Sequence, residues 1–302
     1  MNYLRLYLVL LICFLLIFSS CKKGNKILKD TDFNLVNYDN VLEQLVEKLP
    51  SDKIVHRATL SNDSEQFYVT ISNRDFTSFD IKVVDIKEDS LGELENTTIN
   101  SPDHDDHGLS FSPDGQSLYF SSTRPSSEAD TMYRWSLWKS NLKNGNWGEP
   151  YLIPIPDLNQ KHISHPSINS DSVLYFHVSD LDYSNMSVHS FELKNGHNSN
   201  AQEVKFSEDF KSGTCTPFIL SDQDKLLFAS IGESLDLVIC DELENGVWTK
   251  CNTLSKDILK NGLGNPTVSP DGQHLFYTIG TYDFSDPWKI INIPIKEIDT
   301  TQ

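Results

Sequence analysis

The sequence predicts an all-β protein, a β-propeller of four-stranded antiparallel blades with five visible repeats and one short N-terminal helix. A unit of a short strand, an Asp-bearing turn and a second apolar strand recurs along the chain, and its copies end on average 52 residues apart. Asn-Gly pairs between apolar runs, a strong β-hairpin signal, recur at positions 144, 195 and 245. Repeated units of about 40–50 residues with four strands each are typical of blades around a central channel. The ring has five blades, or six if both termini build a degenerate sixth one.

The first half of each unit contains an Asp in its turn, most clearly in LSFSPDGQSLYF and PTVSPDGQHLFY. In a Ser-Pro-Asp-Gly turn, Pro restricts φ, Gly supplies a positive φ, and the Asp carboxylate accepts hydrogen bonds from nearby backbone amides. We therefore interpret the turn Asp as structural rather than catalytic. The five copies lie at 58–69, 109–120, 166–176, 217–228 and 266–277.

Residues 1–20 are typical of a lipoprotein signal peptide. Arg5 precedes an apolar run from Leu6 to Phe18, and small residues stand directly before Cys21. The run of 13 residues is short for a membrane span, which takes about 20. The FSSC end resembles the lipobox of bacterial lipoproteins, in which the Cys is lipidated, so Cys21 is the predicted lipidation site and residues 21–30 form a tether.

This leader predicts a protein of the cell envelope that is held to a membrane by a lipid anchor. The outer membrane is the first expectation, with the protein at its periplasmic or surface face. An ordinary cleaved signal or an uncleaved anchor is the alternative.

Residues 31–50 precede the predicted propeller, which we place at 51–298. A capping-box pattern at Asn40–Glu43, followed by apolar residues at helical spacing as far as Pro50, predicts one short amphipathic helix. The stretch 32–38 is a candidate strand. Since the last unit lacks an obvious fourth strand, this stretch could complete that blade and close the ring.

The chain carries a formal net charge of −18, although its first 29 residues hold five basic and no acidic side chains. Residues 30–302 therefore carry −23. A surface of this charge repels nucleic acids and anionic lipid headgroups, so we exclude nucleic acid as a partner. Neutral glycans, cationic groups, metal ions and other proteins of the cell envelope remain as partner classes.

Cysteine is scarce, and Cys240 and Cys251 are predicted to face each other across a hairpin. A two-residue turn at Asn245-Gly246 pairs the flanking residues symmetrically, which brings these two opposite each other. Counting outward from the turn makes them a hydrogen-bonded pair, whose Cα atoms lie about 5.5 Å apart and permit a disulfide. Two separate buried thiols are the alternative.

The segments SFSPDGQSLYFSSTRP and VSPDGQHLFYT resemble the WD-like Pro-Asp-Gly repeat of TolB-type β-propellers, and the resemblance covers about residues 57–298. It implies a periplasmic or surface propeller, often a lipoprotein, that binds proteins or glycans. The chain departs from TolB because the 30 residues before its first blade are too few for an N-terminal α/β domain. It also lacks the G-x-S-x-G motif of hydrolase domains, which propeller-bearing serine peptidases carry.

The loops that enter the innermost strands should meet at one mouth of the channel, and histidines concentrate there. Two of these loops contain H-x-x-H about one blade apart, in DHDDH at 103–107 and in KHISH at 161–165. Imidazole and carboxylate groups that converge from several loops suit Zn²⁺, Mn²⁺ or a similar divalent ion. Oligogalacturonate-lyase propellers resemble this arrangement in their use of channel-mouth histidines. The candidate metal ligands are His104, His107, His162 and His165.

Four further residues are candidates for ligand binding. His56 and Arg57 precede the innermost strand of the first unit, and Asp106 lies within DHDDH. Arg124 follows the second strand of its unit, where it either binds a carboxylate of a ligand or bridges to the turn Asp of a neighbouring blade. The alternative for DHDDH is a solvated acidic loop without a site.

Two function classes fit these features. The first is a membrane-anchored, non-catalytic envelope lipoprotein that binds a protein or glycan at the channel mouth. The second is a metal-dependent carbohydrate-active enzyme, a lyase or hydrolase, that uses the four histidines. No H-E-x-x-H, P-loop or three-glycine dinucleotide motif occurs, so the candidate divalent ion is the sole cofactor that the sequence suggests.

Overall fold

The computed structural model describes residues 36–302 except 194–199, 211, 221–224, 232–234, 255–258, 260 and 299–302. The chain divides into two units, Met1–Leu35 and Val36–Gln302, and the description below concerns the second. The predicted signal peptide, the tether, Cys21 and most of the candidate strand at 32–38 lie outside the described residues. Within the described part of the chain, no helix combines the length and apolar character needed to cross a membrane.

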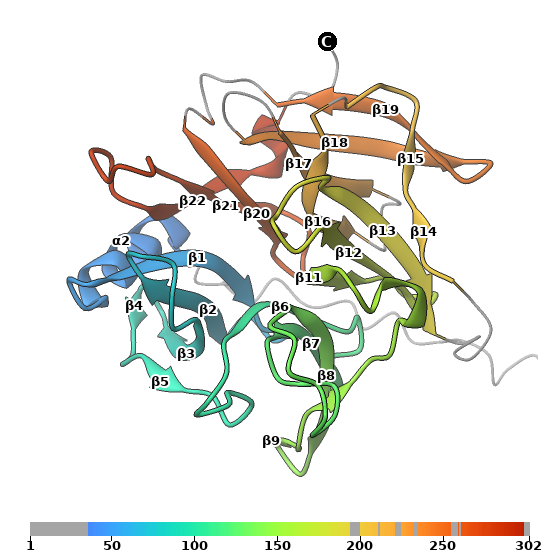
Figure 1. The fold of residues 1–302 in the computed structure, drawn as a ribbon. Coiled ribbons are helices and arrows are strands. Elements are labelled where there is room, and N and C mark those ends of the chain that lie inside the picture. The colour runs from blue at the N-terminus through green and yellow to red at the C-terminus, as the bar shows by residue number, and fades with distance from the viewer. Residues whose placement is uncertain are drawn as a thin grey trace, which may run out of the picture. The chain divides into compact units, whose positions relative to one another are not determined.

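Five antiparallel blades follow one another along the described chain, which confirms the predicted all-β propeller (Figure 1). Each blade begins at the centre with its innermost strand, and successive strands lie farther out. The strands of the first two blades are β1 (Lys53–Leu60), β2 (Gln66–Asn73), β3 (Asp80–Lys87), β4 (Ser90–Leu91) and β5 (Glu95–Asn96), then β6 (Asp106–Phe111), β7 (Ser117–Ser122), β8 (Ser136–Lys143), β9 (Asn146–Trp147) and β10 (Tyr151–Leu152).

The last three blades repeat this plan with small variations. The short β15 pairs in parallel with β19 at the outside of the fourth blade, and one residue pair joins β18 to β20 of the fifth. Short 3-10 helices cover Pro156–Leu158 and Ile295–Glu297. The strands are β11 (His162–Ile168), β12 (Val173–Ser179), β13 (Ser187–Glu192) and β14 (Gln202–Glu203), then β15 (Lys205–Phe206), β16 (Thr214–Leu220), β17 (Lys225–Ile231), β18 (Leu235–Glu244) and β19 (Val247–Thr253), then β20 (Gly262–Val268), β21 (His274–Ile279) and β22 (Lys289–Pro294).

The ring closes after five blades within the described residues, because the first blade packs on the fifth. Thr267 and Thr278 of the fifth blade donate hydroxyl hydrogen bonds of 2.5 and 2.6 Å to the carbonyls of Ala58 and His56 in β1. Hydroxyl groups also join the inner strands of other neighbouring blades, such as Thr59 to the carbonyl of Leu109 at 2.9 Å. Small polar side chains therefore satisfy backbone carbonyls between neighbouring blades.

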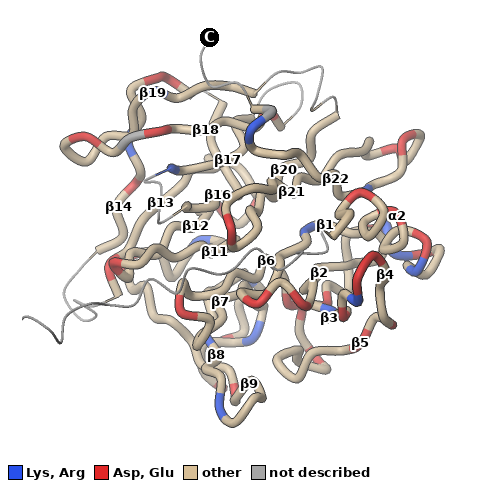
Figure 2. The backbone as a smooth tube through the Cα atoms, turned by 180° about the vertical axis from the view of Figure 1, so that it is seen from behind, with Lys and Arg blue, Asp and Glu red and all other residues tan. Residues whose placement is uncertain are grey.

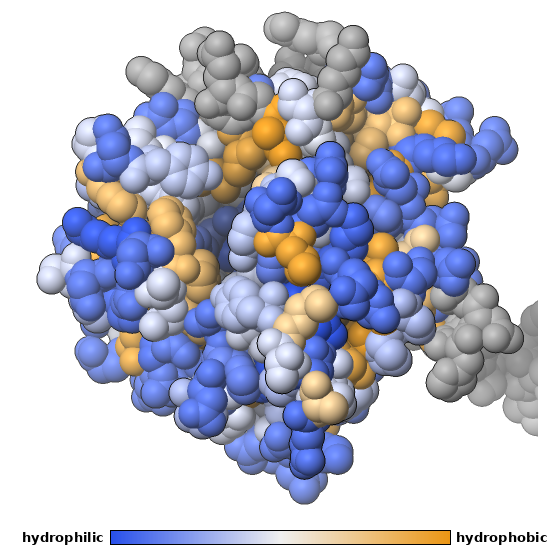
Figure 3. All heavy atoms as spheres, in the orientation of Figure 1, coloured by the Kyte–Doolittle hydropathy of each residue, from blue (hydrophilic) through white to orange (hydrophobic). Residues whose placement is uncertain are grey.

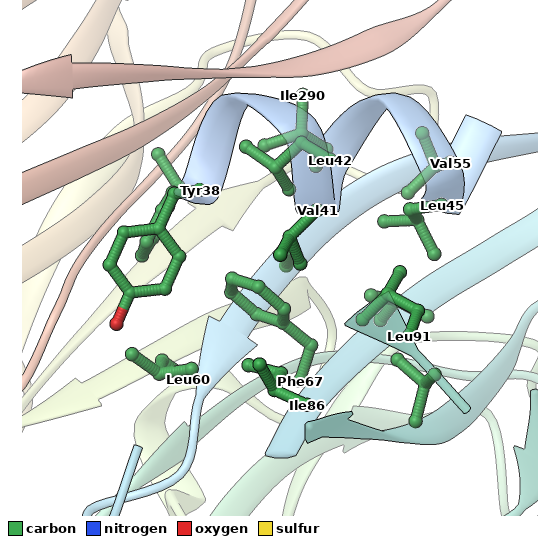
Figure 4. Packing of buried hydrophobic residues seen from close by; sticks show 14 of the residues in the cluster. Tyr38, Val41, Leu42, Leu45, Val55, Leu60, Phe67, Ile86, Leu91 and Ile290 are labelled. Atoms are coloured by element: carbon green, nitrogen blue, oxygen red, sulfur yellow. The ribbon is translucent and has the colours of Figure 1, made fainter. Parts of the chain in front are cut away.

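Helix α2 (Tyr38–Lys48) lies beside the last blade and includes Tyr38, the end of the stretch that the sequence offered as a candidate strand. It packs against β22 of the fifth blade and β4 of the first. Figure 4 shows Val41 and Leu45 directed from the helix toward Phe67 and Leu91 of the first blade, with Ile290 of the fifth blade beside the helix. Apolar residues at helical spacing bury one face, which explains why this segment forms a helix.

The predicted helix is present, but the predicted cap is wrong. The N-cap is Asn37, whose side chain accepts a hydrogen bond from the backbone N–H of Asn40 at 3.3 Å. The helix therefore starts before Asn40 and includes Tyr38, whose ring packs edge-on against Phe67 and Phe276. Burial of this aromatic ring favours the earlier start over the capping box.

Three of the five turns that defined the repeat have the predicted structural role. In the third copy the prediction is wrong, because the Asn169 side chain and not Asp171 accepts the backbone hydrogen bonds, and Asp222 of the fourth copy lies outside the described residues. The Asp114 carboxylate accepts hydrogen bonds from the Ser112 hydroxyl at 2.5 Å and from the Gln116 N–H at 3.0 Å. Asp271 makes the equivalent bonds with Ser269 and Gln273, and Asp63 does so with Ser61 and Glu65. Positive φ angles occur at the Asn-Gly turns 144–145 and 245–246, as two-residue hairpins require, whereas the turn at 195 lies outside the described residues.

Cys240 and Cys251 lie opposite each other in the β18–β19 hairpin and form a disulfide, as the register predicts. Their Cα atoms are 4.0 Å apart, closer than the predicted hydrogen-bonded pair. Lys250, next to Cys251, has a positive φ of 51°, so the ladder is irregular here and counting from the turn does not give the pair type. Cys215 is a buried free thiol.

The surface of the described unit reflects the acidic composition. Asp and Glu outnumber Lys and Arg along the backbone trace (Figure 2). On the face shown in Figure 3, hydrophobic residues form separate small groups between hydrophilic ones. Scattered hydrophobic residues of this kind are ordinary on protein surfaces.

Candidate ligand-binding site

A bulge in each innermost strand shapes one mouth of the channel. The register shifts at His165 in β11, at Thr216 in β16 and at Asn265 in β20, and all three residues have positive φ angles of 46–62°. The shift in β1 falls at His56, and that in β6 follows His107. A bulge adds an unpaired residue and redirects neighbouring side chains. As a result, His or polar side chains from all five inner strands face one cavity.

In β6 the bulge depends on a glycine. Gly108 has a φ of +67°, and a Cβ at this position would lie 3.2 Å from the Cα of His165 in the next blade. The two blades therefore approach closely here, which brings His107 and His165 together.

The cavity at this mouth has a volume of about 800 Å³. Its walls combine aromatic rings with histidine, serine and asparagine side chains, and none of its described lining residues is acidic. Four aromatic side chains at the cavity come from four different blades and are 40–63% exposed: Phe76, Tyr133, Tyr183 and Tyr282. We call these four residues the aromatic rim.

Part of the aromatic rim belongs to a turn that recurs in three blades. The segments NRDF (73–76), DLDY (180–183) and TYDF (281–284) follow the second strand of their blades. In each, the last aromatic residue has a φ of 58–62° and donates its N–H to the carbonyl three residues earlier. A positive φ is uncommon for bulky side chains, and this turn brings the rings of Phe76 and Tyr183 to the cavity. In the fifth blade the equivalent Phe284 packs against Trp288 instead, and Tyr282 lines the cavity.

Histidines from neighbouring blades meet on the floor of the cavity. The ring centroids of His107 and His165 are 4.5 Å apart, and those of His165 and His177 are 6.1 Å apart. His56 lies at the first blade, 5.0 Å from the ring of Trp288. Burial lowers the pKa of His56 to about 3 and that of His177 to about 4, and it lowers the pKa values of His107 and His165 well below the usual range. The histidines of the floor are therefore neutral at pH 7.

The four histidines predicted as one metal site do not come together. His107 and His165 are close, but both ring nitrogens of His162 are occupied: Nδ1 accepts from the Trp135 N–H at 3.1 Å, and Nε2 lies 3.2 Å from the carbonyl of Leu181. His104 is exposed on its loop and does not line the cavity. Across the described residues, no group of three or more His, Cys, Asp or Glu side chains is arranged to hold a metal ion.

Asp106 and Arg124, both predicted to bind a ligand, bind each other instead. Arg124 Nη1 lies 3.0 Å from Asp106 Oδ1, and Arg124 also donates to the carbonyl of Ile99. Asp106 is fully buried, and its second oxygen accepts from the Ser101 N–H at 2.7 Å. Neither residue lines the cavity. The predicted bridge from Arg124 to a neighbouring turn Asp is also wrong, because the partner belongs to the same blade.

The structure separates the two candidates of the first unit, because Arg57 does not line the cavity. His56 lines the cavity, and its Nε2 lies 2.7 Å from the Ser72 hydroxyl. Arg57 is 1% exposed, and its three side-chain nitrogens have no hydrogen-bond partner among the described residues. Its guanidinium carbon lies 6.0 Å from the ring of Phe218 in the fourth blade. Burial lowers the pKa of Arg57 to about 9, so the group still carries its charge at pH 7.

Several residues of the candidate site were not predicted from the sequence. His177 lies in the middle of VLYFHVS, a strand that reads as apolar core, so its position gave no reason to expect a pocket. The rim residues Phe76 and Tyr183 carry a signal in the recurring turn described above, which a comparison of the loops after each second strand detects. Tyr133 lies in a longer loop without this pattern.

Known proteins share the fold of this chain but little of its sequence. No family model and no curated protein matches the chain. The GH43 endo-arabinanase from Bacillus licheniformis superposes with a TM-score of 0.53 and 11% identity, over 82% of this chain and 95% of the arabinanase. TolB from Acinetobacter baumannii gives a TM-score of 0.48 and 16% identity, over 82% of this chain and 56% of TolB. A puromycin-hydrolyzing peptidase from Mycobacterium tuberculosis gives 0.44 and 11%, over 75% of this chain and 34% of the peptidase.

The chain thus spans about half the length of TolB and a third of that of the peptidase. Fold alone does not determine function, so at these identities the ligand has to be inferred from the chemistry of the cavity. The similarity to the arabinanase, which extends over nearly all of that enzyme, identifies the chain as a β-propeller.

Proposed function

We propose that this protein is a non-catalytic binding protein of the cell envelope, and that its channel-mouth cavity takes a glycan segment. The aromatic rim is the observation that carries this proposal. Four exposed aromatic side chains from separate blades surround a cavity with polar groups on its floor. The C–H faces of sugar rings stack on aromatic rings while sugar hydroxyls bond to polar groups, and Tyr and Trp suit sites that are apolar at one end and wet at the other.

The form of the cavity favours a glycan over a protein partner. Its volume of about 800 Å³ lies in the range of small-ligand sites, about 300–1,000 Å³. A stable protein partner typically covers about 800 Å² of each surface, mostly on a flatter face. Nucleic acid, whose bases also stack on aromatic rings, is disfavoured by the charge of −18.

The arrangement of residues also favours binding over catalysis. Glycoside hydrolysis commonly uses two carboxylates that flank the scissile bond, and the described cavity lining contains no Asp or Glu. A metal-dependent lyase or hydrolase needs a convergent set of ligands, and His162 and His104 do not join His107 and His165 in one. We therefore place the enzyme second.

Removal of a rim tyrosine should weaken glycan binding. We expect Tyr282→Ala and Tyr183→Ala each to raise the dissociation constant of a bound oligosaccharide about tenfold, or ~1.4 kcal/mol, because each deletes a stacking surface. Trp135 and Trp288 line the cavity, so intrinsic fluorescence during titration with a panel of neutral and acidic oligosaccharides reports binding directly.

Tyr151→Ala is the matched control, since Tyr151 is 46% exposed on β10 and does not line the cavity. Equal effects of all three substitutions would contradict a rim-specific role. Cleavage of the oligosaccharide by the wild-type protein, detected by mass spectrometry, would favour the enzyme instead.

We further propose that Cys21 anchors the protein to a membrane of the cell envelope, with the leader sequence as support. The Cys21→Ser variant should lose incorporation of labelled fatty acid and move from the membrane to the soluble fraction after cell fractionation. The Cys13→Ser variant serves as the control, because Cys13 lies within the apolar run of the leader. Full membrane retention of Cys21→Ser would contradict the lipid anchor.

A further inference from the structure

The cavity floor contains buried polar groups without hydrogen-bond partners among the described residues. Both ring nitrogens of His177 and the hydroxyl of Ser179 are unpartnered, and these side chains are 7% and 1% exposed. Both residues lie on β12 and line the cavity. Buried polar groups are nearly always satisfied in native proteins, so such groups on a cavity wall indicate a ligand that satisfies them.

A buried positive charge, Arg57, directly follows the cavity-lining His56 in β1. Arg57 has no hydrogen-bond partner among the described residues, and its charge is felt at both His107 and His165. No described residue of the cavity lining is acidic, so nothing on the wall neutralises this charge. A buried charge without a counter-charge is costly, which makes an anion at this floor strongly favourable.

We propose that the cavity floor is a subsite for one carboxylate group, and that the ligand is a sugar acid or a glycan containing one. This inference rests on the proposed function and names the class of glycan. The Ser179 hydroxyl and an N–H of His177 donate to the carboxylate, and Arg57 supplies the positive field from behind His107 and His165. The sugar ring then extends toward the aromatic rim.

The charge of the site favours a carboxylate over a phosphate ester. One buried cation, Arg57, lies near the floor without lining the cavity, and it balances one negative charge. A phosphate monoester carries between one and two charges at pH 7, so part of its charge would stay buried without compensation. A neutral sugar would leave Arg57 without a counter-charge.

The test compares matched acidic and neutral ligands on the whole chain. Methyl β-D-glucuronide and methyl β-D-glucoside differ at the ring carbon that bears either the carboxylate or the hydroxymethyl group. We expect the wild-type protein to bind the glucuronide at least about tenfold more tightly, in isothermal titration at constant ionic strength. Sodium acetate should compete with the glucuronide, whereas phosphate at equal charge concentration should compete less.

Substitutions test whether the residues of the floor cause the preference for the glucuronide over the glucoside. Ser179→Ala and Arg57→Met should each bring the ratio of the two affinities toward one, and Arg57→Lys should restore part of it because it keeps the charge. Lys143→Met removes an exposed cation at the outer end of β8 and should leave the ratio unchanged. Circular dichroism identifies variants that fold, and Ser179→Ala keeps the test decisive if both Arg57 variants unfold.

Equal wild-type affinity for the two methyl glycosides would overturn the carboxylate subsite while leaving the proposed glycan binding intact. A preference that persists in folded Ser179→Ala would overturn it too, as would stronger competition by phosphate than by acetate. If no mono- or oligosaccharide of either kind binds, the proposed function itself fails.

Discussion

Lowering the pH from 7 to 4 should reduce the free energy of unfolding by at least about 4 kcal/mol. The folded chain holds His56 and His177 neutral, because burial lowers their pKa values to about 3 and about 4. In the unfolded chain their pKa is about 6.5, so that state takes up protons which the folded state cannot. Each of the two histidines then contributes a loss of about 3 kcal/mol at pH 4.

One group acts in the opposite direction. Burial raises the pKa of Asp106 to about 6, against the effect of Arg124, so the folded state binds this proton more readily than the unfolded state. Asp106 therefore offsets about 2 kcal/mol of the loss as the pH falls from 6 to 4. His107 and His165, whose pKa values are also lowered by burial, add to the loss. The free energy of unfolding should therefore be highest above about pH 6.5 and decline as the pH falls toward 4.

Urea unfolding curves at several pH values between 7 and 4 measure this dependence. The variant His56→Gln/His177→Gln should show a shallower decline, because two of the titrating groups are gone. His104→Gln, which replaces an exposed loop histidine, should follow the wild type. An unchanged slope in the double variant would show that the floor histidines do not cause the acid sensitivity.

The second large effect concerns the buried ion pair of the second blade. Replacement of Asp106 by Ala should lower the free energy of unfolding by about 3–5 kcal/mol, because Arg124, whose side chain is 14% exposed, loses its counter-charge. The pair itself contributes much less than this figure. The raised pKa of Asp106 shows that Arg124 does not fully compensate for the burial of the carboxylate.

The double variant Asp106→Leu/Arg124→Met separates the two effects. Since it removes both charges, it should cost much less than Asp106→Ala alone, and denaturant unfolding at pH 7 measures both. Glu93→Ala is the control, because the pair of Glu93 with Lys48 is largely exposed and contributes about 0–1 kcal/mol. A double variant as unstable as the single one would contradict the charge-burial explanation.

The fold was predictable from the sequence because its signals are local. The Asp114 turn and the Asn-Gly hairpins depend on hydrogen bonds within a few residues, and the blade period follows from their repetition. The facing positions of Cys240 and Cys251 follow from the nearby turn in the same way. The place of α2 between the first and last blades was not predictable, since it depends on packing between residues more than 200 positions apart, such as Tyr38 and Phe276.

The candidate site was only partly predictable. The channel mouth and four of its histidines, His56, His107, His162 and His165, follow from the period of the repeat. The H-x-x-H spacing is the same in both loops and predicts the same role for both histidine pairs. In the structure, however, the ring nitrogens of His162 form hydrogen bonds with the backbone of Trp135 and Leu181. Asp106 and Arg124 are 18 residues apart in the chain, and only the closing of their blade makes them a pair.

The sequence by itself determined the repeating blade, its turns and the acidic character of the chain, because these features depend on neighbouring residues and on composition. The tertiary structure decided which polar groups are occupied by the fold and which remain for a ligand. Arg57 and His177 are of interest because their side chains are buried without hydrogen-bond partners among the described residues. This property arises only when five blades close around one axis. The proposed carboxylate subsite therefore depends on ring closure, which no local pattern of residues encodes.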